Sequence, residues 1–346
     1  MEEKTHSKGR LIFQVVFLLF LIVGSVAIIR HQKETSYQHS QGFIFGTFYN
    51  IIYQYDKPLD DEILACLNEV DAALSMFNDT SVISRINRNE SMETTTMFRD
   101  VFEKSQKVSE ATEGNFDVTV APLVNLWGFG FKNAIDGNDK QAAIDSIMHF
   151  VGYKKVRIQG NKIVKADKRL MLDCSAIAKG YGSDVVAKML TSHGIDNFMV
   201  EIGGEIVSRG NNESRMPWKV GVTKPTDDTL NVKTELQTVL NVTNINMATS
   251  GNYRNFYYKD GKKYAHTIDP KTGRPVLHSL LSATVFAEDC ATADAYATSF
   301  MVMGLEKSKQ FLKHHSELQA YFIYADEKGE NAVWYSPWLK SKIVTQ

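Results

Sequence analysis

Asp294 and Thr298 have the residue types and the spacing that could bind a metal ion. They lie in a stretch of small and apolar residues, 287–304, whose second half is typical of a helix. A spacing of four residues places both side-chain oxygens on one helix face, one turn apart. Such a pair could hold a hard cation, which prefers oxygen ligands. It could equally be a polar helix start with satisfied hydrogen bonds, and the pair alone leaves both interpretations open.

A second candidate is the segment Asp173–Gly182, in which a carboxylate precedes a glycine-rich turn and a helix. Amide groups exposed at such a helix start can bind phosphate or other polar ligand groups. An ordinary helix capped by Asp173 or Ser175 is the alternative. The segment matches neither a P-loop nor the G-x-G-x-x-G fingerprint, so the common nucleotide-binding motifs are absent.

Three further segments contain paired glycines or a histidine among polar residues. Residues 201–205 carry Gly203–Gly204, which would let a ligand approach the backbone but would also suit a tight turn. Residues 248–254 contain Thr-Ser-Gly, and 266–273 begin with His266. His266 could accept a proton from a hydroxyl nucleophile, although a lone histidine is more often structural. Asp269 lies in a good turn sequence and is predicted to be structural.

Composition indicates a globular protein and excludes some partners. The 346 residues are enough for one large or two ordinary domains, and 43% of them are hydrophobic. A formal net charge of −1 gives no electrostatic case for a nucleic-acid partner. The three cysteines are too few and too scattered for a disulfide framework or a zinc site.

The N-terminus predicts a membrane segment. Basic residues at 4, 8 and 10 precede the apolar run 11–29, which nearly spans a hydrocarbon core of ~30 Å. This charge pattern leaves the N-terminus in the cytoplasm and exports the body. Residues 25–27 form a weak cleavage site, so a removed signal peptide is the alternative to the favoured uncleaved anchor. We therefore expect a membrane segment at 1–30, a polar stalk at 31–42 and a catalytic body at 43–346.

The pattern of expected elements indicates an α+β fold. Expected strands occupy 43–55 with a bulge or close backbone approach at Gly46, 198–202, 218–222, 238–245, 248–258, 281–287, 321–324 and 332–335. Expected helices occupy 60–77, 97–112, 142–151 and 294–303, with a turn and helix over 173–193 and a hairpin over 155–172. Residues 114–130 are expected to be irregular, and 223–233 to form a surface excursion. The regular β-α-β alternation of a parallel sheet is missing.

Taken together, these segments resemble the FAD:protein FMN transferase family, also called the ApbE or Ftp family. The resemblance covers about residues 43–304. Its motifs are Gly46-Thr47, Ser81-x-x-Ser84-Arg85-x-Asn87, Gly114-x-Phe116-Asp117-x-Thr119-x-x-Pro122-Leu123-x-x-Leu126-Trp127-Gly128, Asp173-x-Ser175-x-x-x-Lys179-Gly180, Gly203-Gly204, Thr249-Ser250-Gly251-x-Tyr253, His266-x-Ile268-Asp269-Pro270-x-Thr272-Gly273-x-Pro275 and Ala293-Asp294-x-x-Ala297-Thr298. So many matches in order are very unlikely to arise by chance.

The resemblance implies a fold and a reaction. Members of the family have a T-fold-like core with mixed or antiparallel sheets and packed helices. They bind FAD and Mg²⁺, cleave the pyrophosphate, and join FMN to a threonine hydroxyl of a partner protein, releasing AMP. Typical acceptors are membrane subunits of redox complexes that face out of the bacterial cytoplasm. The family therefore implies a catalytic body on the extracytoplasmic side of the cytoplasmic membrane.

The resemblance also assigns roles to individual residues. Asp294 and Thr298 match the magnesium ligands, with the backbone carbonyl of Ala176 as the third. His266 matches the proposed base that activates the acceptor threonine. The residues that match FAD contacts are Phe77, Asn115, Phe116, Asp117, Asp173, Lys179 and Ile268.

Two positions depart from the family pattern. Phe45 replaces the usual methionine before Gly-Thr, and Phe77 stands where tyrosine is common. The lipoprotein cysteine is also missing, and the apolar anchor could replace it. The leading hypothesis is Mg²⁺-dependent protein flavinylation. The alternatives are an FAD pyrophosphatase that gives FMN and AMP, and a flavin-binding protein without turnover.

Overall fold

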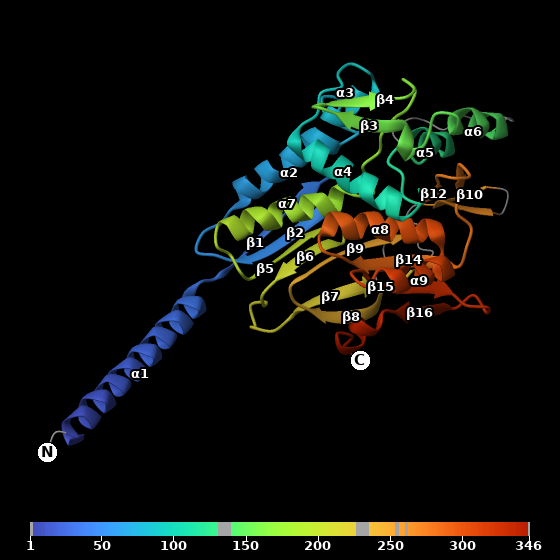
Figure 1. Cartoon of the computed structure of the whole chain (residues 1–346). Coiled ribbons are helices and arrows are strands. Elements are labelled where there is room, and N and C mark those ends of the chain that lie inside the picture. Colours follow the sequence, from blue (N-terminus) through green and yellow to red (C-terminus); the bar gives the residue numbers. More distant parts are fainter. Residues whose placement is uncertain (1–2, 131–139, 226–234, 253–255, 260–261, 345–346) are drawn as a thin grey trace.

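An eight-stranded antiparallel sheet lies at the centre of the computed structural model, which describes residues 3–130, 140–225, 235–252, 256–259 and 262–344 (Figure 1). The strands follow the order β1-β2-β5-β6-β9-β14-β15-β16. Their bounds are β1 Tyr37–Ile44, β2 Thr47–Gln54, β5 Phe198–Ile202, β6 Glu205–Arg209, β9 Ile245–Gly251, β14 Leu280–Phe286, β15 Gln319–Ala325 and β16 Asn331–Tyr335. The regular alternation of burial along β2 reflects a sheet with two differently covered faces.

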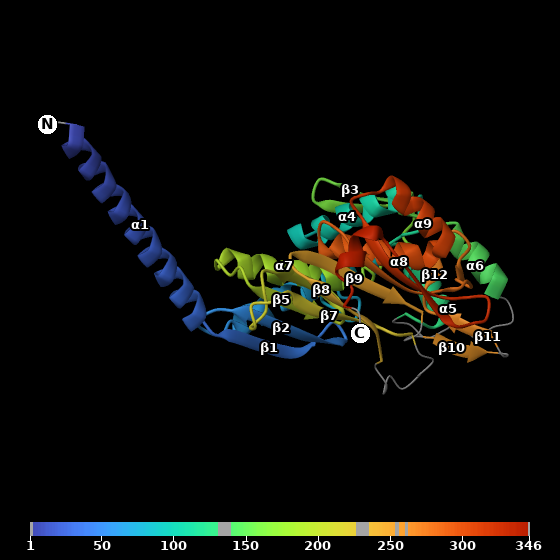
Figure 2. The same ribbon diagram turned by 90° about the horizontal axis from the view of Figure 1, so that it is seen from below.

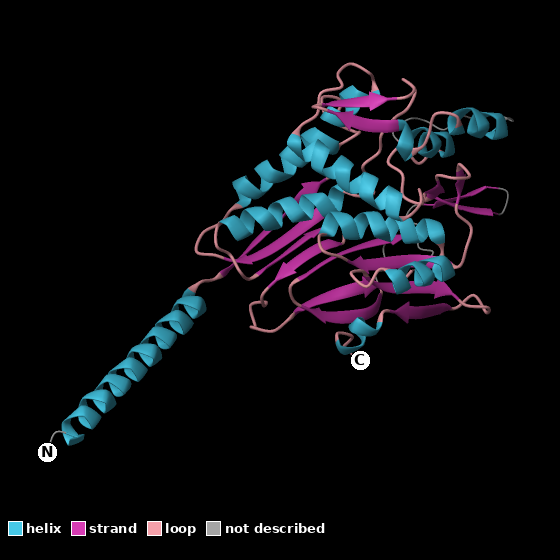
Figure 3. Cartoon of the chain, in the orientation of Figure 1, coloured by secondary structure: helices cyan, strands magenta, loops and turns pink. Residues whose placement is uncertain are grey.

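Helices cover one face of this sheet, as Figure 3 shows. They are α2 Asp60–Leu74, α4 Thr96–Ala111, α7 Ala178–Ser192, α8 Cys290–Met303 and α9 Leu305–His314. The hairpin of β7 Trp218–Thr223 and β8 Leu236–Val242 packs separately, and its side chains Trp218, Val220 and Leu240 bury Ile206 and Met247 of the main sheet. The two layers therefore enclose distinct apolar cores.

Smaller elements surround the helical layer. They are α3 Val82–Asn87, α5 Ala121–Trp127, α6 Lys140–Met148, the short helices Tyr153–Lys155 and Pro337–Ser341, β3 Val156–Gln159, β4 Lys162–Lys165, β10 Phe256–Lys259, β11 Lys262–Ala265, β12 Ile268–Asp269 and β13 Arg274–Pro275. The N-terminal helix α1, Glu3–Glu34, contains a segment at Gly9–Arg30 that is long and apolar enough to cross a membrane. Figures 1 and 2 show α1 leaving the body at its β1 side.

Helix α8 lies at the centre of the helical layer and is buried almost all round. It packs on β9 and β14 on one side and on α7 and α4 on the other. Alanines at 291, 293, 295 and 297 are fully buried, and their small side chains allow this close packing. Its first turn is capped twice, because Thr292 N donates to Asp289 Oδ1 at 2.8 Å, and the carboxylate of Asp184 accepts from the Cys290 and Ala291 amides at 2.9 Å.

Helices α7 and α8 touch backbone to backbone at Gly180. A Cβ atom placed on Gly180 would lie 2.3 Å from the carbonyl oxygen of Cys290. The contact could not be relieved by rotating a side chain, because the neighbouring atom belongs to the main chain. The glycine therefore sets the separation of the two helices that form the floor of the cavity described below.

The α+β class predicted from the sequence is confirmed, and most predicted elements lie close to their observed positions. The predicted stalk at 31–42 is wrong in its second half, because residues from Tyr37 onward pair with β2 as an edge strand. The interruption at Gly46 is a two-residue hairpin turn, with positive φ at Phe45 and Gly46, so the single expected strand is two strands.

The segment 114–130 also differs from its prediction, because α5 begins at Ala121 with Pro122 in its first turn, where proline is tolerated. Strand β6 and helix α9 were not predicted. Residues 226–233 of the expected surface excursion, and 253–255 of the expected strand 248–258, lie outside the described residues.

We expect Gly180→Ala to destabilise the fold by about 1–3 kcal/mol, because the added methyl group forces α7 away from α8. The matched control is Gly182→Ala in the same helix, whose methyl group would lie nearest to side-chain atoms of Phe45 and Ile202, which can move. Alanine also favours the helix by ~1 kcal/mol, which offsets part of that contact. Chemical denaturation of both variants measures the difference, and equal losses would contradict the backbone contact.

Candidate active site

One cavity of about 780 Å³ opens between the helical layer and the loops around it. Its walls come from the loop after α2, the segment before α5, the start of α7, the turn between β5 and β6, the end of β9, the β12 segment and α8. All eleven residues singled out in the sequence line it, namely Phe77, Asn115, Phe116, Asp117, Asp173, Ala176, Lys179, His266, Ile268, Asp294 and Thr298. Segments more than 200 residues apart in the chain therefore meet at one site.

The cavity floor is a buried charge cluster made by Lys179, Glu205 and Asp294. Lys179 Nζ lies 2.9 Å from Glu205 Oε1 and 3.9 Å from Asp294 Oδ2. Both carboxylates are only 2% exposed. The amide of Gly180 donates to Asp294 Oδ2 at 3.2 Å, which the close approach of α7 to α8 makes possible.

Burial controls the titration of this cluster. Burial raises the pKa of Glu205 and that of Asp294 above their ordinary values, and the ammonium of Lys179 opposes both shifts. Burial alone would lower the pKa of Lys179, but the charges of Asp294 and Glu205 raise it above its ordinary range. The two carboxylates therefore favour the charged form of Lys179.

The oxygen atoms of this wall suit a hard cation such as Mg²⁺. Thr298 lies one turn after Asp294 on α8, and its hydroxyl is 3.0 Å from Ser250 Oγ. Within the described residues, Asp294 Oδ1 has no hydrogen-bond partner, and Ala176 lies in the turn before α7. The part of the chain that the structure describes contains no cluster of three or more His, Cys, Asp and Glu side chains that could hold a metal. A Mg²⁺ ion here would take its remaining ligands from water or substrate.

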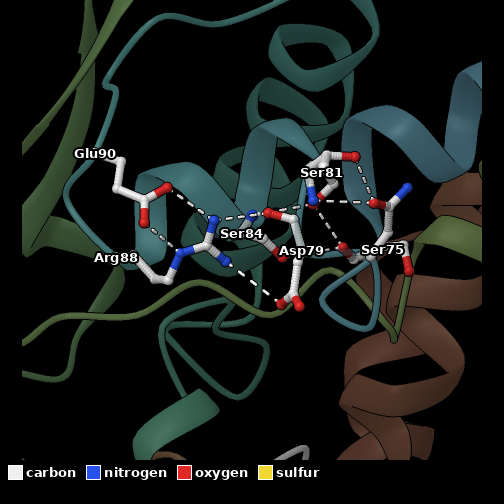
Figure 4. A network of polar contacts seen from close by, with 8 residues as sticks. Ser75, Asp79, Ser81, Ser84, Arg88 and Glu90 are labelled. Carbon is white, nitrogen blue, oxygen red and sulfur yellow. Dashed lines mark hydrogen bonds and ion pairs between the residues drawn. The ribbon is translucent and has the colours of Figure 1, made fainter.

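A polar network fixes the loop that carries Phe77, as Figure 4 shows. Ser81 caps α3 by accepting from Ser84 N at 3.1 Å, and its hydroxyl donates to the carbonyl of Ser75 at 2.6 Å. Arg88 donates to the carbonyl of Asp79 at 2.7 Å. The Phe77 ring stays 77% exposed at the cavity wall, although its backbone is held on both sides. Such a ring is available to cover an apolar part of a ligand.

Asn87, at the end of α3, connects this loop to the segment of Asp173. Its side-chain amide donates to the Leu172 carbonyl at 2.9 Å, and its oxygen accepts from the Leu172 amide at 2.7 Å. Asp173 then accepts from Ser175 N at 2.8 Å, which closes a local turn before α7. The helix itself begins after Ile177 without a side-chain cap, so the cap expected at Asp173 or Ser175 is wrong. Burial raises the pKa of Asp173, which faces the cavity.

Both carboxylate oxygens of Asp117 accept hydrogen bonds from neighbouring groups of the protein. Its Oδ1 accepts from the amide and the hydroxyl of Thr119, at 2.8 and 2.6 Å, and its Oδ2 accepts from Tyr153 N at 2.7 Å. Asn115 likewise donates to the Thr112 carbonyl at 2.7 Å. These bonds hold the turn at Asn115 and Phe116 against the cavity, so Asp117 supports the wall chiefly through the backbone.

His266 lines the same cavity, two residues before the buried Ile268. Its ring packs against Phe129 with ring centroids 6.4 Å apart. Asp269 accepts from Lys271 N at 2.8 Å and from the hydroxyl of Thr272 at 3.1 Å, which fixes the following turn. Asp269 therefore has the structural role expected from the sequence.

The sequence did not single out Glu205, Ser250 or Phe129 as site residues, although all three line the cavity. Glu205 follows the turn at Gly203 and Gly204, whose φ angles are 65° and 107°. A carboxylate directly after such a turn, followed by Ile206 and Val207, was the available signal. Sequence alone could not show that the side chain points inward to Lys179.

Comparison with known proteins identifies the family. Residues 45–322 match the model of the ApbE family. The chain belongs to the ApbE family. This membership confirms the family and the class of enzyme that the sequence motifs predicted.

Curated relatives support the same assignment over most of the chain. A protein of Vibrio cholerae named FAD:protein FMN transferase is 40% identical over 285 residues, which are 80% of this chain and 84% of the relative. A protein of Haemophilus influenzae with the same name is 34% identical and covers 90% of this chain and 93% of its own length. The agreement therefore extends through the body and is not limited to single motifs.

Solved structures of the family share the fold. The flavin transferase ApbE from Vibrio cholerae has a TM-score of 0.79 at 35% identity, covering 89% of this chain and 99% of its own. The apo form of the Pseudomonas stutzeri flavinyl transferase ApbE has a TM-score of 0.75 at 28% identity, with coverages of 88% and 95%. The predicted α+β architecture is thus that of solved ApbE proteins.

Proposed function

We propose that this protein transfers FMN from FAD to a threonine hydroxyl of a partner protein, in a Mg²⁺-dependent reaction that releases AMP. The observation that carries the proposal is the convergence of Asp294, Thr298 and His266 on one cavity. The names of the relatives, FAD:protein FMN transferase, support the choice of donor and group. Protein flavinylation is therefore the function that the site supports best.

Asp294, Thr298 and the carbonyl of Ala176 are the residues proposed to hold Mg²⁺. They offer a carboxylate, a hydroxyl and a carbonyl oxygen, which are the hard ligands this ion prefers. When bound, the ion supplies neutralisation of the negative charge that develops on the pyrophosphate oxygens. Ser250 supports the set, because its hydrogen bond to Thr298 orients that hydroxyl.

The apolar part of the cavity lining is proposed to hold the flavin. Phe77, Phe116 and Ile268 provide apolar surface, and aromatic rings stack well on planar ligands. Asn115 and Asp117 shape the turn beneath them. Asp173 and Lys179 present charged groups near the start of α7, where polar groups of the ligand would lie.

His266 is proposed as the base for the acceptor. It accepts the proton of the threonine hydroxyl as the threonine oxygen forms a bond to the phosphorus of the FMN moiety. The bond between that phosphorus and the bridging oxygen breaks, and AMP leaves with the electron pair. Because the nucleophile comes from the partner, the enzyme needs a base and no nucleophile of its own.

Helix α1 is proposed to stay in the bacterial cytoplasmic membrane as an anchor, with the body on the extracytoplasmic side. Its segment Gly9–Arg30 is not buried by the rest of the protein and has the length of a membrane span. We propose that the acceptor is a membrane subunit of a redox complex, since a tethered enzyme meets such a partner most readily.

The test combines the purified full chain, FAD, Mg²⁺ and a candidate acceptor. We expect the intact mass of the acceptor to increase by one FMN moiety and the increase to be lost in an acceptor Thr→Val variant. AMP release without acceptor at the same rate would favour the pyrophosphatase. FAD that stays intact under all conditions would favour a flavin-binding protein, and either result would overturn the proposal.

Asp294→Ala should reduce Mg²⁺-dependent turnover about a hundredfold or more, because it removes a charged ligand of the proposed ion. The fold should persist, since Lys179 keeps its ion pair with Glu205. Asp100→Ala is the control, as it removes an exposed carboxylate of α4 that lies outside the cavity. Turnover is measured against Mg²⁺ concentration, and an unchanged metal dependence would remove Asp294 from the ligand set.

Phe77→Ala should weaken FAD binding about tenfold without lowering stability, because an exposed ring contributes little to the core. Phe48→Ala is the matched control, since Phe48 is 76% exposed but does not line the cavity. Equilibrium titration with FAD compares the two variants. Equal affinities would show that Phe77 does not contact the flavin.

A further inference from the structure

We propose that Glu205 is a positioning residue that holds the ammonium of Lys179 away from Asp294 and so keeps Asp294 available to a metal ion. The inference rests on the proposed Mg²⁺ site. It concerns a residue that the sequence motifs did not place in that site. The argument depends on the three charged side chains of the cavity floor and on the backbone that fixes them.

The distances show which carboxylate Lys179 prefers. Its Nζ is 2.9 Å from Glu205 Oε1, a direct ion pair, and 3.9 Å from Asp294 Oδ2, which is too long for a hydrogen bond. Lys179 has a flexible stem with rotatable bonds and a 28% exposed side chain. Nothing in the stem itself would prevent the ammonium from moving to Asp294.

An ammonium on Asp294 would compete with a metal ion. Asp294 is 2% exposed, so its carboxylate is poorly solvated and its attraction for a nearby cation is weakly screened. Its Oδ2 already accepts a hydrogen bond from Gly180 N. A second bond from Lys179 would occupy the oxygens that the ion needs, and both cations cannot lie close together.

Glu205 is built into the fold as the alternative partner. The turn at Gly203 and Gly204 places it at the first position of β6, and its carbonyl accepts from Ser183 Oγ of α7 at 3.1 Å. Its backbone is therefore fixed to the helix that carries Lys179. The side chain is held inward and cannot reach solvent.

The second oxygen of Glu205 supports this role. Oε2 is buried and has no hydrogen-bond partner in the part of the chain that the structure describes. A buried carboxylate oxygen left unpaired destabilises the fold, because it has lost its hydration without gaining a partner. A purely structural glutamate would be expected to satisfy both oxygens. Instead, this position holds the negative charge of the Glu205 carboxylate beside the ammonium of Lys179.

The experiment measures Mn²⁺ binding, as a spectroscopic substitute for Mg²⁺, by electron paramagnetic resonance of the full chain. We expect Glu205→Gln to weaken Mn²⁺ binding about tenfold, because the released ammonium moves to Asp294. Lys179→Met in the Glu205→Gln background should restore most of the affinity. Lys179→Met alone should strengthen Mn²⁺ binding by a clearly smaller factor than it does in the Glu205→Gln background, since the ammonium already lies closer to Glu205 than to Asp294.

The four proteins form a double-mutant cycle that separates positioning from net charge. If only net charge mattered, Lys179→Met would strengthen binding by the same factor in both backgrounds. Positioning predicts a much larger gain when Glu205 is already glutamine. Equal factors, or an unchanged affinity in Glu205→Gln, would overturn the inference.

A second variant guards against failure to fold. Glu205→Asp keeps the charge but withdraws the carboxylate by one methylene, and thermal unfolding checks each variant. It should weaken Mn²⁺ binding by a smaller factor than Glu205→Gln, and unchanged binding would overturn the inference. If the unmodified chain bound no Mn²⁺ at all, the proposed metal site itself would be wrong, which is a different outcome.

Discussion

The arrangement of α7 and α8 is constrained by the burial of two carboxylates, those of Asp294 and Glu205, in one cluster. Two carboxylates in a region of low polarity repel each other and are poorly solvated, so their burial requires a fixed counter-charge. Lys179 supplies it, and Gly180 adds an amide hydrogen bond to Asp294. Both groups come from the first turn of α7, which reaches α8 because residue 180 has no side chain. Helix contact and charge compensation are therefore one constraint.

Several polar side chains near the cavity stabilise its walls by hydrogen bonds within the protein and leave no free polar atom for a ligand. Asn87 joins α3 to the segment before Asp173, and Asp117 joins the turn at Phe116 to Tyr153. Asp184 provides acceptors for the first amides of α8. Each of these side chains forms hydrogen bonds with backbone groups that have no partner in a helix or a sheet. The cavity walls are irregular backbone, and these side chains give them a defined shape.

The sequence predicted the location of the site better than its internal arrangement. Ordered motifs sufficed to predict that Phe77, His266 and Asp294 would meet, and the structure brings them to one cavity. Periodicity placed α2 and β5 well, because their apolar spacing follows directly from their burial. It missed β1, whose polar residues suit an edge strand as well as a linker. The contact of Glu205 with Lys179 depends on a tertiary approach that no local pattern records.

Only two residues separate the end of α1 at Glu34 from the start of β1 at Tyr37, and the far end of β1 turns at Phe45 and Gly46 in the cavity wall. Eight residues of strand span about 26 Å at ~3.3 Å per residue. With α1 held in the membrane as proposed, this strand would act as a spacer between the bilayer and the cavity. The enzyme would work at a nearly constant height, and an acceptor would have to present its threonine within that narrow zone above the lipid.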